Sequence, residues 1–429
     1  MPGTNESEMR SEAGNSHEGG CAGSQPGGHR GASQLRQAGC VSHGPYTGCS
    51  RRGGRSVGGV RCGANGLVAQ WLPRESGSVV DVCGSTQGHR RARKRFTGVT
   101  VAGQLQILAE GLEAAAAEHG EIPDRRLALL FACAHPAIDA GVRAPLMLQV
   151  VVGLDAKTIA SAFLTSPAAM GKRLGRAKDK LRHGGIPFSV PEREELSSRL
   201  DSVLEAIYAA FAEGWSDPGA ADVVRDLTSE AMFLARVVTE LLPDEPEALG
   251  LLAFLLHAEA RRRARRNANG EYVPLAEQDS ALWDWEMIGE AEAVIRRASA
   301  LGAIGRYQLE AALQSAHVYR GGTDHANWAD VAQLYDALFA LTSSPVVALN
   351  RALAIAELHG AAAGLDAMPD PKADARLSEY QPHWAARAEL LAKTGANDEA
   401  RHAYEIAIGL ERDPAVRLFL QQRQAVLAP

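Results

Sequence analysis

A chain of 429 residues exceeds one typical domain, and 46% apolar residues against 22% charged residues supply enough apolar side chains for packed cores. Aromatic residues make up only 5%, while Ala and Leu are abundant, which favours an all-α protein. A net charge of -6 excludes a protein that coats nucleic acid along its whole length. The sequence has no long apolar run and no signal-peptide pattern, so we expect a cytoplasmic protein without a membrane partner.

Residues 1–97 are crowded with Gly, Ser, Arg, His and Cys and show no apolar periodicity. Such a segment cannot bury a core, and we expect it to be low-complexity and disordered. Two interpretations stay open: a flexible basic arm, or sequence translated from a wrong start or frame. From Val99 onward the apolar spacing becomes helical, and residues 98–123 are predicted to form a linker helix.

A compact unit of four helices is predicted in residues 124–189. Apolar spacing and chain-breaking residues place the helices at residues 124–134, 137–152, 155–163 and 167–183. Pro136 follows the first helix, Gly153 closes the second, and Pro187 follows the fourth.

The last two of these helices have the physical parts of a helix-turn-helix at residues 154–182. Asp155 can cap the first helix, and Ser166 can cap the second, with Pro167 in its first turn. Helical spacing predicts one buried stripe on the second helix, formed by Met170, Leu174, Ala177 and Leu181.

The rest of that second helix is strongly basic, with six Lys or Arg side chains against one acidic residue, Asp179. A basic helix is often only a solvated face, but the preceding helix and tight turn favour a recognition helix in the major groove of DNA. The N-terminal part of such a helix lies nearest the base edges, and later residues hold phosphates. The predicted DNA-contacting residues are Ser166, Ala168, Ala169, Lys172, Arg173, Arg176 and Lys180.

Residues 190–429 are a succession of amphipathic helices separated by turn signals such as Asp217-Pro218 and Ser344-Pro345. In HWAARAELLAKTGANDEARHAYEIAIGLERDP, the spacing of Gly395, Ala400 and Tyr404 is that of a tetratricopeptide unit. We therefore expect an α-helical, tetratricopeptide-like C-terminal extension. Its function would be the binding of a regulatory protein or ligand, and a purely structural bundle is the alternative.

A resemblance to a known family covers the helix-turn-helix segment, RRLALLFACAHPAI before it, IPFSVP after it, and EARRRARRNANGEYVPLAEQDSALWDW further on. In these segments the chain resembles extracytoplasmic-function sigma factors with a long helical extension. The resemblance implies a role in transcription initiation, with region 4 recognising the minus-thirty-five promoter element and contacting the flap of RNA polymerase. It places promoter contact at Lys172, Arg173 and Arg176, and it implies that the extension regulates this activity.

Two features depart from that family. Nothing in residues 1–95 provides the helices of region 2, which binds the polymerase clamp and melts the minus-ten element. Gly171 and Gly175 lie inside the recognition helix and would each weaken it by roughly 1 kcal/mol relative to Ala. Two alternatives therefore remain: a helical-repeat interaction scaffold, or a DNA-binding regulator without sigma activity.

No catalytic residue, cofactor site or metal site is predicted. Cys133 and His135 are two positions apart and would not face each other on a helix, and the six cysteines contain no C-x-x-C pair. The arginine run at residues 261–266 is expected to be a solvated face paired with acidic neighbours, with a second DNA or polymerase contact as the alternative. Trp283, Asp284, Trp285 and Glu286 are expected to be packing anchors, with a ligand-binding role as the alternative.

Overall fold

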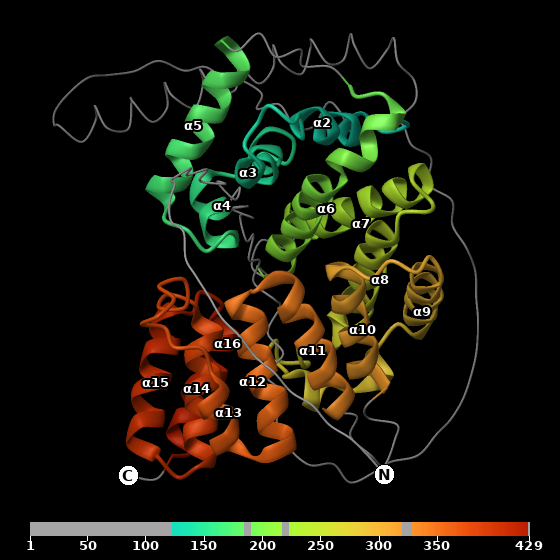
Figure 1. Ribbon diagram of the computed structural model, residues 1–429. Helices are drawn as coiled ribbons and strands as arrows, with labels where there is room; N and C mark the ends of the chain where they lie inside the picture. The colour runs from blue at the N-terminus through green and yellow to red at the C-terminus, as the bar shows by residue number, and fades with distance from the viewer. Residues whose placement is uncertain (1–121, 184–189, 217–222, 320–327, 428–429) are drawn as a thin grey trace, which may run out of the picture. The chain divides into compact units, whose positions relative to one another are not determined.

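The computed structural model describes residues 122–183, 190–216, 223–319 and 328–427 (Figure 1). These residues form fifteen α-helices and no β-strand, apart from one isolated bridge between Arg266 and Tyr272. The prediction of an all-α protein is confirmed. The low-complexity segment predicted at residues 1–97, and nearly all of the linker helix predicted at residues 98–123, lie outside the described residues.

Four helices occupy the region predicted to hold four. They are α2 (Arg125–Cys133), α3 (Ala140–Val150), α4 (Ala156–Ala162) and α5 (Pro167–His183). The largest difference is at the start of α3, which begins three residues later than predicted. Asp139 is its N-cap and accepts a hydrogen bond from the backbone N–H of Gly141 at 2.9 Å, so the residues before Asp139 belong to a turn.

One apolar core joins these helices to the next part of the chain. It extends from Leu127 in α2 to Ala311, and it is built largely around α6 (Arg193–Ser216), α7 (Val223–Leu241) and α8 (Pro246–Ala260). Arg199 of α6 is 5% exposed and donates a hydrogen bond to the carbonyl of Phe131. The core therefore continues across the division predicted between residues 189 and 190, and that division stays a prediction.

Beyond α8 the chain forms three short 3₁₀ turns and then two helices that both pack against α8. The helices are α9 (Trp285–Ala300) and α10 (Arg306–Tyr319), and the 3₁₀ turns are η2 (Arg262–Arg265), η3 (Leu275–Glu277) and η4 (Ser280–Leu282). Gly250 is needed where α8 meets α10, because a Cβ added there would lie 2.5 Å from the backbone nitrogen of Gln308.

The last six helices contact one another in chain order. They are α11 (Trp328–Thr342), α12 (Pro345–His359), α13 (Ala361–Ala367), α14 (Gln381–Lys393), α15 (Asn397–Leu410) and α16 (Pro414–Ala425). Between α14 and α15, which lie side by side in Figure 1, Tyr404 is buried against the small residues Ala400 and Ala407. Its hydroxyl donates to Glu389 Oε2 at 2.8 Å, so this aromatic ring both fills the interface and satisfies a buried carboxylate.

Candidate nucleic-acid interface

Helices α4 and α5 pack against each other and are joined by four residues, 163–166. The connection is tight because the backbone N–H of Thr165 bonds to the carbonyl of Ala160 at 3.0 Å, and Leu164 adopts a φ of 48°. Phe163 packs against the main apolar core. These contacts hold α5 in a fixed direction relative to α4.

Both predicted helix caps at this site are present. Asp155 accepts a hydrogen bond from the backbone N–H of Thr158 at 2.7 Å, and this bond holds the pKa of the Asp155 carboxyl below its ordinary value. Ser166 Oγ accepts from the backbone N–H of Ala169 at 3.2 Å. Each cap satisfies a backbone donor at the start of a helix, so the two helix starts are set by local sequence.

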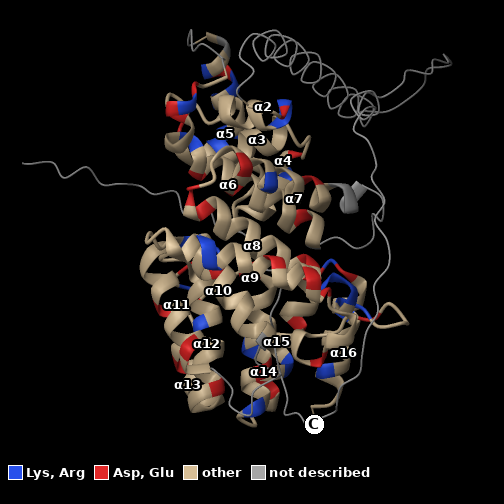
Figure 2. Cartoon of the chain, turned by 90° about the vertical axis from the view of Figure 1, so that its right-hand side faces the viewer, with Lys and Arg blue, Asp and Glu red and all other residues tan. Residues whose placement is uncertain are grey.

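The two faces of α5 differ as its sequence predicts. Met170, Leu174 and Ala177 are at most 5% exposed, and Leu181 packs against the same core. Opposite this stripe, the side chains of the predicted DNA-contacting basic residues are all exposed. They are Lys172, Arg173, Arg176 and Lys180. Figure 2 draws all Lys and Arg residues in blue, including those of α5.

The remaining predicted contact residues lie at the start of α5. Ser166 and Ala168 are exposed, and Ala169 is half-buried. Because Ala168 and Ala169 are small, the backbone at this end of the helix can approach another surface closely. A 17-residue helix with an exposed cationic face and a slender N-terminal end has the form needed to enter a major groove and hold phosphates on either side.

No nucleophile and base are brought together at the predicted helix end near Cys133. Burial raises the pKa of the Cys133 thiol to about 12, so the thiol stays protonated and unreactive near neutral pH. The pKa of His135 is lowered, first by burial and then by the positive charge of Arg199. Among the residues that the structure describes, no cluster of three or more His, Cys, Asp or Glu side chains could hold a metal ion.

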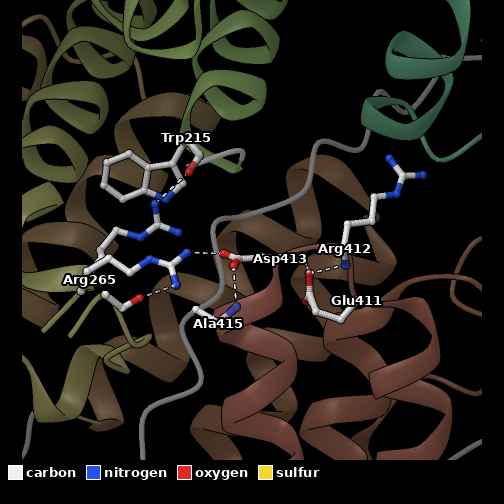
Figure 3. Close-up of polar contacts among 8 residues, drawn as sticks. Trp215, Arg265, Glu411, Arg412, Asp413 and Ala415 are labelled. Atoms are coloured by element: carbon white, nitrogen blue, oxygen red, sulfur yellow. Dashed lines mark hydrogen bonds and ion pairs between the residues drawn. The ribbon is translucent and has the colours of Figure 1, made fainter. Parts of the chain in front are cut away.

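The arginine run after α8 is not the solvated face that its sequence suggests. Of its five arginines only Arg263 is exposed. Arg265 donates to the backbone carbonyl of Trp215 at 2.8 Å and lies 4.3 Å from the centroid of that indole ring, while Arg266 pairs with Asp413 (Figure 3). The expected pairing with an acidic neighbour is confirmed for Arg262, which pairs with Glu259, but Arg265 and Arg266 connect distant parts of the fold.

The two tryptophans after this run behave differently from each other. Trp283 packs against a small buried cluster that contains Ala260 and Ile288, as a packing anchor should. Trp285 is 50% exposed, and its indole N–H donates to the carbonyl of Ser280 at 3.1 Å. The prediction of a packing anchor is therefore wrong for Trp285, because the first residue of α9 points to the surface.

Sequence reasoning missed one residue of the connection. Leu164 lies between two predicted helices and has no predicted role, yet its side chain packs against a cluster in the C-terminal helices that contains Val346, Leu349 and Tyr380. The available signal was a second apolar side chain directly after Phe163 in a connection of only four residues.

None of the described helices is both long enough and apolar enough to cross a membrane. A protein-family model described as a family of unknown function, DUF6596, matches residues 199–299. An uncharacterized protein of Rhizobium meliloti (strain 1021) is 40% identical over 306 residues, which cover 71% of this chain and 72% of the relative. No solved structure gave a significant match.

Proposed function

The chain belongs to the same protein family as this rhizobial relative, and we propose that it is a sigma-factor-like transcription initiation protein. In this proposal α4 and α5 form a helix-turn-helix that binds promoter minus-thirty-five DNA, and the protein engages the core of RNA polymerase. The tetratricopeptide-like extension predicted at residues 190–429 regulates that binding.

The observation that carries the proposal is the division of α5 into two faces. Its apolar stripe is buried against the preceding helices, so the helix is anchored, and its ammonium and guanidinium groups are directed to solvent. The capped helix α4 and the tight connection present it in the manner of a recognition helix. The resemblance of the surrounding segments to extracytoplasmic-function sigma factors supports promoter DNA as the nucleic acid.

Within the site we assign two kinds of contact. Lys172 and Arg173 lie in the N-terminal half of α5 and would read base edges, together with the backbone near Ala168 and Ala169. Arg176 and Lys180 are one and two turns further along and would hold phosphates. The two pairs should therefore respond differently to substitution.

The test uses the full chain and duplexes selected from a random library by the wild-type protein. Lys172→Ala with Arg173→Ala should weaken binding to selected duplexes at least about tenfold and reduce discrimination against unselected ones. Arg176→Ala with Lys180→Ala should weaken binding to selected and unselected duplexes alike. It should also reduce the steepness of log affinity against log salt concentration by about two units. Fluorescence anisotropy at several salt concentrations measures both effects.

The matched control removes two exposed arginines elsewhere, with Arg296→Ala and Arg412→Ala. The control removes as much positive charge as either test pair. It therefore distinguishes the loss of specific contacts on α5 from a general effect of net charge on DNA affinity. Equal affinities for the control and the two α5 variants would reject the recognition-helix assignment.

Polymerase engagement is tested by competition with another sigma factor for bacterial core RNA polymerase. DNA binding without core binding would favour a DNA-binding regulator that lacks sigma activity.

An interaction scaffold is the second candidate, and it is favoured by apolar side chains exposed on α11, where Phe339 is 40% and Leu341 is 48% exposed. A scaffold predicts no salt-dependent DNA binding by the full chain.

A further inference from the structure

Leu164 has a backbone conformation that leucine rarely adopts. Its φ of 48° lies in the left-handed region, where the Cβ of an ordinary residue crowds the following carbonyl and where Gly or Asn is the usual choice. A leucine at such a position is unfavourable for the isolated turn. Its presence indicates that the side chain makes a favourable contact elsewhere.

That contact is with the C-terminal helices. Phe163, directly before it, packs against the main core of α2 to α10, but Leu164 packs against a separate cluster. The buried members of that cluster come from α12, from the segment before α14, and from α14 itself. They are Val346, Leu349, Leu377, Tyr380 and Ala386. We name this set, with Leu164, the turn-docking cluster.

The turn-docking cluster lies next to the DNA-facing end of α5. Ser166 and Ala168 follow Leu164 by only two and four residues. A major groove about 12 Å wide is bounded by two phosphate backbones, so the turn before a recognition helix faces one of those backbones when the helix enters. The C-terminal helices that pack on Leu164 would occupy the space that this phosphate backbone needs.

The exposed charges beside the cluster have both signs. Asp370 and Glu379 are exposed, but Lys372 is exposed in the same segment, and Arg376 next to Leu377 pairs with Asp374. The closed contact is therefore incompatible with DNA binding because of the space that the C-terminal helices occupy beside the turn.

We propose that the turn-docking cluster is an autoinhibitory contact, in which the C-terminal helices hold the helix-turn-helix by Leu164 and mask its DNA-reading end. This inference rests on the proposed function and specifies how the same site is regulated. Because the link at the turn depends on one half-buried leucine, the contact can open without unfolding either side, and DNA binds the open form. Loss of the contact therefore increases the fraction of binding-competent protein.

The test is Leu164→Asn in the full chain. Asn tolerates the left-handed conformation and removes the apolar side chain, so the turn is retained while the contact is weakened. We expect affinity for a selected duplex to rise about tenfold, in proportion to the larger open fraction. Met368→Ser, which reduces the apolar surface on the other side of the contact, should raise affinity in the same direction.

Ser343→Asn is the matched control. Ser343 also has a φ of 48°, but it is exposed in the turn between α11 and α12. The Ser343→Asn substitution relieves backbone strain in the same way as Leu164→Asn but leaves the turn-docking cluster unchanged. The DNA affinity of this variant should therefore equal that of the wild type. Thermal unfolding of all variants shows whether each remains folded.

The outcomes separate the inference from the function on which it rests. Unchanged or weaker binding by Leu164→Asn, with binding still dependent on Lys172 and Arg173, would overturn the autoinhibitory contact and leave the recognition helix intact. Binding that is independent of Lys172 and Arg173 in both the wild type and Leu164→Asn would overturn the proposed function, and the masking with it.

Discussion

Glycine has opposite consequences at two places in this protein. Gly171 and Gly175 lie on the exposed side of α5, and a Cβ added at either would meet no atom within 4 Å. Gly250 instead lies where the backbones of α8 and α10 approach closely, with Gln308 N 2.5 Å from an added Cβ. Of these three positions, only Gly250 requires glycine for packing.

We therefore predict opposite signs for two identical substitutions. Gly175→Ala should raise the free energy of unfolding by about 0.5–1 kcal/mol, because alanine reduces the backbone freedom of the unfolded chain without a clash. Gly250→Ala should lower it by about 1–3 kcal/mol, because α8 and α10 must move apart. Urea titrations measure both, and destabilisation by Gly175→Ala would contradict the open surface described for α5.

At the scale of elements, the start of α16 is fixed by one carboxylate with two partners. Asp413 accepts a hydrogen bond from the backbone N–H of Ala415 at 2.9 Å and pairs with Arg266, which belongs to the segment after α8 (Figure 3). One residue therefore caps the last helix and connects it to a segment more than a hundred residues earlier in the chain.

The two roles of Asp413 can be separated. Asp413→Asn keeps a capping oxygen but loses the ion pair, and should lower the free energy of unfolding by about 0.5–1 kcal/mol. Asp413→Ala loses both and should lower it by about 1 kcal/mol more. The effect of Asp413→Asn should shrink in 0.5 M salt, which screens a partly exposed pair. Equal stabilities for the Asn and Ala variants would show that the cap contributes nothing.

At the scale of the whole molecule, the described helices do not share one apolar core. The main cluster joins α2 to α10, whereas a separate cluster of Ala388, Leu391, Tyr404 and neighbouring side chains holds α14, α15 and α16 together. Regions that share a core open together, and regions with separate cores can open independently.

Native-state hydrogen exchange tests this organisation. We expect the most protected amides of α3 and α8 to exchange with the same opening free energy, although the two helices are far apart in the sequence. Amides of α15 should exchange through a separate opening with its own dependence on denaturant. Exchange of α3 through an opening that leaves α8 protected would show that the helices before residue 184 fold as an independent unit.

The sequence by itself determined the helical class, the limits of α4 and α5 to within a residue or two, and the division of α5 into a buried stripe and a cationic face. These properties are local, because a cap needs only the next few residues and a stripe needs only a period of 3.6. The start of α3 was missed by three residues because the helix was expected directly after Pro136, whereas the residue that caps it is Asp139.

Only the tertiary structure decided where the arginines after α8 and the leucine of the connection find their partners. Arg265 meets Trp215 from 50 positions away and Arg266 meets Asp413 from 147 positions away, and no local pattern marks such pairs. A charged run looks solvated in sequence because charge favours water, but packed aromatic and acidic partners can replace that water. Leu164 likewise became informative only when its neighbours in space were known.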